Sequence, residues 1–100
     1  KDLFIGEDTI ISAKSKIDKT VYHIRFHLMP EISTTVTESK KNIIIRTKEN
    51  NIWMFKSNKE IMIEKSIFVK NDMAVETSQI VISGITSSLK NKIIWSLEKV

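Results

Sequence analysis

Residues 22–28 read Tyr22-His23-Ile24-Arg25-Phe26-His27-Leu28, and polar and apolar side chains alternate along the whole stretch. Successive side chains of a β-strand point to opposite faces, so the apolar residues of this stretch would share one face. His23, Arg25 and His27 would share the other face. An apolar face suits a protein core, whereas imidazole and guanidinium groups bind anions, move protons or bind metal. The stretch therefore predicts a half-buried strand that carries any chemistry of the chain on its polar face.

Alternating or β-branched stretches recur along the chain at intervals of roughly ten residues. We expect strands at Val21–Leu28, Thr34–Thr37, Asn42–Lys48, Ile52–Lys56, Glu60–Val69, Thr77–Ile85 and Lys92–Leu97. About seven short strands separated by polar turns are typical of an all-β sandwich or barrel.

Two stretches are less regular than the rest. In residues 1–20, Ile10-Ile11 and Ile17 are candidates for further short strands. Within Glu60–Val69 the alternation slips at Lys65-Ser66. Such a slip indicates either a β-bulge or a strand that is buried on both faces.

Composition excludes several classes of protein. Hydrophobic residues make up 41% and charged residues 28% of the 100 residues, which is ordinary for one globular domain. No apolar run approaches the about 20 residues of a membrane-spanning helix, so we expect no membrane span. The chain has no cysteine, which excludes disulfides and thiolate metal sites. This leaves the compartment open between the periplasm and the cytoplasm of a bacterium.

The net charge of +4 suggests attraction to polyanions. The basic residues are spread along the chain among acidic ones, without a long basic block. We therefore interpret most of them as solvated surface. Aromatic residues do not interleave with a basic stripe, so we expect no nucleic-acid partner.

The two histidines do not form a joint metal site in this interpretation. On one strand His23 and His27 would lie about 13 Å apart, which is too far for one ion. A His-x-His pair would fit better, but Met29 stands where the second histidine would be. We expect no metal ligands in this chain and no cofactor, with a metal ion in a longer parent protein as the weaker alternative. The remaining roles for His27 are proton transfer, carboxylate neutralisation or a simple hydrogen bond within a sheet.

Other candidate residues divide between binding and structure. The guanidinium of Arg25 suits a carboxylate or sulfate of a ligand, or an ion pair across the sheet. Trp53 shares a face with Phe55, and Trp95 lies on an equally apolar face, so both tryptophans are predicted to pack in the core. Tyr22 also lies on the apolar face of its strand, which argues against a catalytic tyrosine.

Several motifs, taken in order, resemble the C-terminal part of heparinase II/III-like proteins. They are Gly6-Glu7-Asp8, Ile24–Leu28 followed by Pro30, Trp53-x-Phe55, Glu64-x-Ser66, Gln79–Gly84 and Trp95. The likeness extends over nearly the whole chain, and Arg25–Leu28 followed by Pro30 is its most specific part.

The resemblance implies an antiparallel β-sandwich of about seven or more short strands, a single domain at residues 1–100. It would be the C-terminal part of a longer polysaccharide lyase, whose N-terminal α/α toroid is absent from this sequence. Such enzymes cleave uronate-containing acidic polysaccharides, glycosaminoglycans among them, by β-elimination in a cleft between toroid and sandwich. The expected partners are the acidic polysaccharide and the missing toroid, and the chain alone would be inactive. The alternative is a non-catalytic carbohydrate-binding or domain-packing module.

Within this resemblance His27 matches the motif position of a catalytic histidine. Arg25 beside it is assigned to substrate binding. His23 matches no family position, and it is assigned to substrate binding because it lies on the same face. The family motif often reads His-Leu-His-Pro, and Met29 replaces its second histidine. This departure argues against a metal role for the pair.

Overall fold

A computed structural model describes residues 3–11, 21–86 and 90–100 of the protein. The strands in these ranges are β1 (Leu3–Ile11), β2 (Val21–His27), β3 (Ser33–Val36), β4 (Asn42–Arg46), β5 (Ile52–Ser57), β6 (Ile61–Lys70), β7 (Met73–Ile85) and β8 (Lys90–Lys99). No helix occurs in the described part of the chain. Among these described residues, five that are not glycine take positive φ angles in turns and loops, namely Glu31, Lys40, Asn50, Asn71 and Asp72. Asparagine and aspartate tolerate this conformation best, which explains how a chain with so little glycine forms tight turns.

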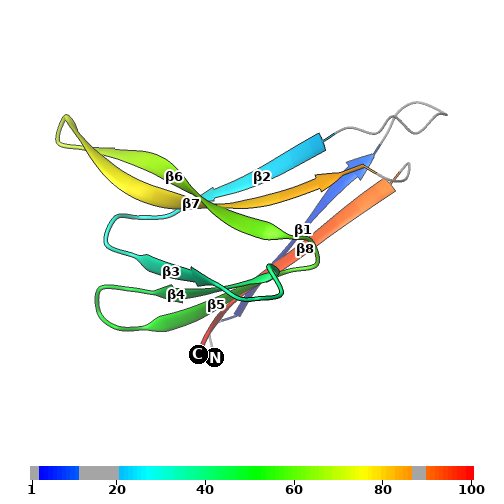
Figure 1. The fold of residues 1–100 in the computed structure, drawn as a ribbon, viewed down its shortest axis with the longest axis horizontal. Helices are drawn as coiled ribbons and strands as arrows, with labels where there is room; N and C mark the ends of the chain where they lie inside the picture. The colour runs from blue at the N-terminus through cyan, green and yellow to red at the C-terminus, as the bar shows by residue number, and fades with distance from the viewer. Residues whose placement is uncertain (1–2, 12–20, 87–89) are drawn as a thin grey trace.

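The strands form two antiparallel sheets that pack as layers (Figure 1). The small sheet has the order β2-β7-β6, and the large sheet has the order β1-β8-β5-β4-β3. The predicted all-β antiparallel sandwich is therefore confirmed, and the described strands form two open sheets instead of a closed barrel. β2 pairs with β7 from Val21↔Ile85 to His27↔Gln79, so it forms an edge of the small sheet.

The core lies between the two inner faces. Its buried members are Ile43, Ile45, Phe55, Ile61, Ile80, Ile82 and Ile93. Phe26 of β2 joins the sheets, since its ring centroid lies 5.3 Å from that of Phe55 and 4.9 Å from that of Trp95, edge to face in both pairs. Both predicted core tryptophans, Trp53 and Trp95, are partly buried and pack against this cluster.

Two glycines make room for aromatic rings on the inner faces. A Cβ at Gly6 would collide with the Trp95 ring, and a Cβ at Gly84 would collide with the Tyr22 ring. Each glycine faces its aromatic residue in the strand register, Gly6↔Trp95 and Tyr22↔Gly84. Each ring lies over a strand position that has no side chain, which explains glycine within a strand interior.

The structure differs from the expectation in residues 1–20. β1 is a strand of 9 residues that pairs with β8 along its whole length, from Leu3↔Glu98 to Ile11↔Lys90. Gly6 and its acidic neighbours have low β-propensity, so the sequence gives little sign of this strand. Pairing with β8 stabilises it. Of the two candidate short strands, Ile10-Ile11 ends β1, and Ile17 lies outside the described residues.

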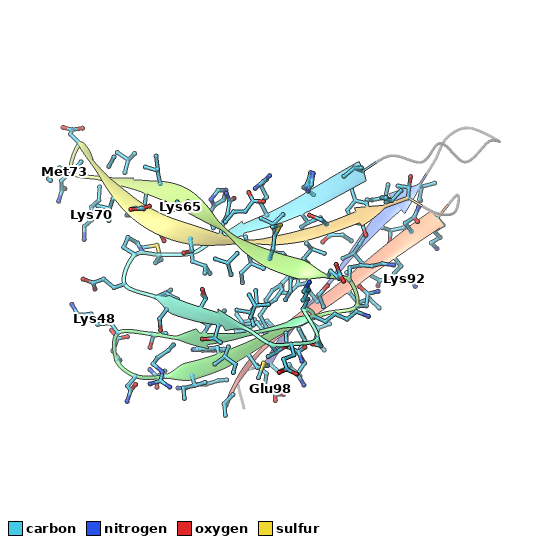
Figure 2. All side chains as sticks on the ribbon, viewed as in Figure 1. Lys48, Lys65, Lys70, Met73, Lys92 and Glu98 are labelled. Carbon is cyan, nitrogen blue, oxygen red and sulfur yellow. The ribbon has the colours of Figure 1, made fainter. Side chains whose placement is uncertain are left out.

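The hairpin of β6 and β7 is longer than expected, because β7 begins at Met73 instead of Thr77. Neither interpretation of Lys65-Ser66 is correct. The register runs unbroken through Lys65↔Ser78 and Ser66↔Thr77, so there is no bulge, and Ile67 is 70% exposed, so the strand is not buried on both faces. Figures 1 and 2 show the end of this hairpin, with Lys70 and Met73, diverging from the large sheet. Burial therefore imposes no alternation there.

Candidate functional site

The outer face of the small sheet carries the predicted site residues. His23, Arg25 and His27 are exposed. Tyr22, Ile24 and Phe26, which alternate with them along the strand, are partly buried and pack against the core. The alternation of β2 is thus as predicted. The register adds residues of the neighbouring strands to the same side. We call this side the polar face; its members are His23, Arg25, His27, Met62, Glu64, Ser66, Gln79, Val81 and Ser83.

Each of the three residues predicted for the site is held at one atom by another strand. The Nδ1 atom of His23 lies 2.9 Å from the Ser83 hydroxyl, and the Nδ1 atom of His27 lies 2.9 Å from the Ser66 hydroxyl. Arg25 donates from Nη1 to Oε1 of Glu64 over 2.9 Å. The ion pair across the sheet that the sequence left open for Arg25 is therefore present. The three side chains form a row along β2, each with a defined orientation.

The middle strand of the polar face is covered by these side chains. Val81 is 0% and Gln79 9% exposed, although both lie on the outer side of the sheet. Arg25 faces Val81 in the register, and His27 faces Gln79. Because the partners of Arg25 and His27 lie on β6, their side chains cross over β7 and shield it.

Gln79 has an incompletely satisfied amide. Its Nε2 atom donates to the Lys65 carbonyl oxygen over 3.1 Å. Its Oε1 atom is buried and has no hydrogen-bond partner among the described residues. A buried acceptor without a partner costs about 1–3 kcal/mol, so this position is a weak point in the packing of the polar face.

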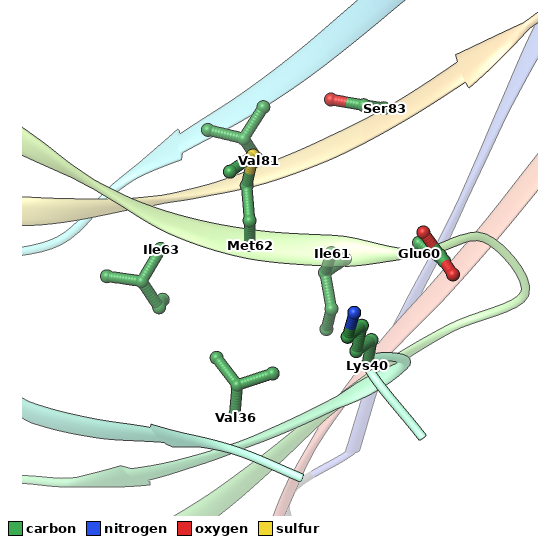
Figure 3. Close-up of a pocket in the computed structure, with 8 residues that line it drawn as sticks. All are labelled: Val36, Lys40, Glu60, Ile61, Met62, Ile63, Val81 and Ser83. Atoms are coloured by element: carbon green, nitrogen blue, oxygen red, sulfur yellow. The ribbon is translucent and has the colours of Figure 1, made fainter. Parts of the chain in front are cut away.

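A groove of about 460 Å³ begins beside this row and passes around the edge of β6 (Figure 3). Met62, Val81 and Ser83 line it on the side of the polar face, and Val36, Ile61 and Ile63 line it on the inner side. Lys40 and Glu60 add one charge of each sign at its end. Since Ser83 holds His23, the groove and the polar row are continuous.

Tyr22 lies on the other side of β2, over Gly84. Burial raises the pKa of its phenol above the usual 10.0. A raised pKa keeps the phenol protonated near neutral pH. Its position on the inner face places it on the opposite side of β2 from His27.

The polar face shows no arrangement typical of a metal centre. In residues 3–11, 21–86 and 90–100, no three histidine or acidic side chains gather closely enough to hold an ion. Glu7, a neighbour of Asp8 in the sequence, forms an ion pair with Lys92 at 3.1 Å on the large sheet.

Sequence reasoning included the residues that orient the site in the motifs of the family resemblance, but it assigned them no role. Glu64, Ser66 and Ser83 are the partners of the row, and Gln79 lies beneath it. Glu64 and Ser66 alternate along β6 as polar residues on one face, which is a signal that the sequence contains. Which of them meets Arg25 or His27 depends on the register of three strands, and the sequence does not show that register.

Comparison with known proteins adds a family to this geometry. Residues 1–96 match the family described as Heparinase II/III-like, C-terminal. No curated protein and no solved structure matches the chain. The described residues contain no helix of the length and apolarity that crossing a bilayer requires. The match spans both sheets, so it applies to the sandwich as a whole and not to one motif.

Proposed function

This chain belongs to the heparinase II/III-like family, whose C-terminal domain it represents, and from this premise we propose that it is one half of a polysaccharide lyase. The substrate would be a uronate-containing acidic polysaccharide, cleaved by β-elimination. An N-terminal α/α toroid of the same polypeptide would supply the other half of the cleft.

One observation carries this proposal. The residues of the most specific family motif, Arg25 and His27, lie side by side on an exposed face, and each is held at one atom from β6. One ring nitrogen of His27 and the remaining donors of Arg25 stay available to a ligand. An imidazole and a guanidinium in this arrangement suit the carboxylate of a uronate.

The chemistry assigns distinct work to the two halves. In β-elimination a base takes the proton from C5 of the uronate, the C4=C5 double bond forms and the C4–O bond breaks, and the leaving oxygen takes up a proton. Negative charge builds on the uronate carboxylate during the first step, and cationic or hydrogen-bonding groups stabilise it. His27 would serve in proton transfer or in carboxylate neutralisation, Arg25 would bind the carboxylate or a sulfate, and His23 would extend the binding row.

The test is the turnover of the full-length parent protein on a panel of uronate polysaccharides that includes heparin and heparan sulfate. Each cleavage creates an unsaturated uronate, which is measured by its ultraviolet absorbance. We expect His27→Ala to lower kcat by about 100-fold or more, the usual contribution of a positioned acid or base. Lys48→Ala serves as the matched control, because Lys48 forms an exposed ion pair with Glu31 and lies in the turn between β4 and β5, which belong to the other sheet. Unchanged turnover in His27→Ala would refute the role of His27.

A second candidate function is a non-catalytic module that binds glycan or packs against another domain. The observation that favours it is the pairing of all three row residues within the sheet, as in a rigid contact surface. Calorimetric titration of this chain with heparin and with duplex DNA at two salt concentrations tests it. Binding of heparin that Arg25→Ala weakens, in a parent without turnover, supports a glycan-binding module, and no binding supports packing. Equal, strongly salt-dependent binding of both polymers indicates general polyanion attraction instead.

A further inference from the structure

The two histidines of the polar face have similar hydrogen bonds but different supports. Ser83 lies on β7 directly opposite His23 in the register, so the His23 bond joins neighbouring strands. Ser66 lies on β6, which does not touch β2 in the sheet order. The His27 bond therefore spans the whole width of the small sheet.

The hydrogen bond from His27 to β6 determines the orientation of the His27 ring. Neighbouring strands lie about 4.8 Å apart, so β2 and β6 are separated by about 10 Å. The side chain of His27 must therefore extend across β7 to bring Nδ1 within 2.9 Å of the Ser66 hydroxyl. Gln79, which faces His27 in the register, is 9% exposed beneath this crossing. Arg25 makes the same crossing to Glu64 over Val81.

We propose that Ser66 is a positioning residue for His27: it holds Nδ1 and so makes Nε2 the nitrogen that faces a ligand. A serine hydroxyl both donates and accepts hydrogen bonds. When Nδ1 carries a proton, the hydroxyl accepts a hydrogen bond from Nδ1–H in the neutral ring and in the protonated ring alike. The ring can gain or lose a proton at Nε2 without leaving its place. The catalytic consequence of this inference rests on the proposed function, but the orientation of the His27 ring can be tested without assuming that function.

Turnover of the full-length parent tests the catalytic consequence. Ser66→Ala should lower kcat by about 10- to 100-fold, since a small misplacement of a reacting group has effects of this size. KM should change less than about twofold, because binding of the ground state is kept. Ser66→Thr retains the hydroxyl on a residue that suits a strand, and should restore most of kcat. Loss in both variants, or in neither, overturns the proposal.

The order of the His27 ring is measured directly on this chain by carbon-13 relaxation of the ring Cδ2–H bonds of both histidines. Ser66→Ala should make the His27 ring mobile and leave the His23 ring ordered, and Ser83→Ala should do the reverse. An ordered His27 ring in Ser66→Ala overturns the proposal. If the wild-type parent shows no turnover on any uronate polysaccharide, the proposed function fails, and the relaxation data still decide whether Ser66 positions His27.

Discussion

The two faces of β2 are held in place by different kinds of contact. On the inner face, Phe26 packs edge to face against Phe55 and Trp95, and Tyr22 lies over Gly84. On the polar face, His23, Arg25 and His27 each make one polar contact near water. Aromatic burial contributes several kcal/mol, whereas exposed polar pairs contribute little. The comparison teaches that the inner face of β2 carries most of its stability, so changes to the exposed side chains of His23, Arg25 and His27 should leave the domain folded.

The largest expected effect comes from the inner face. Phe26→Ala should lower the free energy of unfolding by about 3 kcal/mol, because it removes a ring shared by both sheets and leaves a cavity. The value lies at the low end for phenylalanine, since Phe26 is only partly buried. Urea unfolding of this chain measures it. Arg25→Ala, the adjacent residue on the other face, is the matched control and should cost less than about 1 kcal/mol. Equal losses in the two variants would contradict the comparison.

A smaller loss is expected when a methyl group is added to the inner face. Gly84→Ala places a Cβ where the Tyr22 ring lies, and should cost about 1–3 kcal/mol through overpacking. In the double variant with Tyr22→Ala the collision is absent. Tyr22→Ala should therefore destabilise the Gly84→Ala variant less than it destabilises the wild type. Additive losses in this double-mutant cycle would mean that Gly84 is needed for another reason.

The polar face should contribute much less stability. Arg25 and Glu64 have side-chain exposures of 40% and 37%, so water screens their ion pair. A double-mutant cycle with Arg25→Ala and Glu64→Gln should give a coupling energy of about 0.2–1 kcal/mol. The coupling should shrink further at 1 M salt, where the screening length is about 3 Å. A coupling above about 2 kcal/mol would show that the polar face is a structural element after all.

The smallest effect is a dependence on alkaline pH, which belongs to the inner face. Burial raises the pKa of Tyr22 above 10.0, so the folded state favours the neutral phenol. The resulting stabilisation is complete below pH 10 and is lost as the pH rises through the raised pKa, because the unfolded chain ionises first. Unfolding of the wild type and of Tyr22→Phe, compared between pH 9 and pH 11, measures it. The wild type should lose more stability than Tyr22→Phe, and equal losses would contradict this role of Tyr22.

Much of the fold was predictable because burial imposes a local pattern. The alternation of β2 indicated both of its faces correctly, and the apolar companions of Trp53 and Trp95 indicated that both rings pack against the core. β1 was missed because Gly6 and the acids beside it conceal a strand that depends on β8. The β6–β7 hairpin was misjudged at Lys65-Ser66, because Ile67 and Val69 beyond this point are exposed and burial requires no alternation there.

The candidate site was predictable only in part. Alternation along the chain is a local property, and it sufficed to put His23, Arg25 and His27 on one exposed face. Register is a property of three strands at once, and it brings Ser66 to His27 and Glu64 to Arg25 across 39 residues of sequence in each pair. No local pattern encodes such a separation, because the pairing follows from the packing of both sheets around one core. The sequence alone therefore determined which side chains lie on this face. Their orientation was determined only by the tertiary structure.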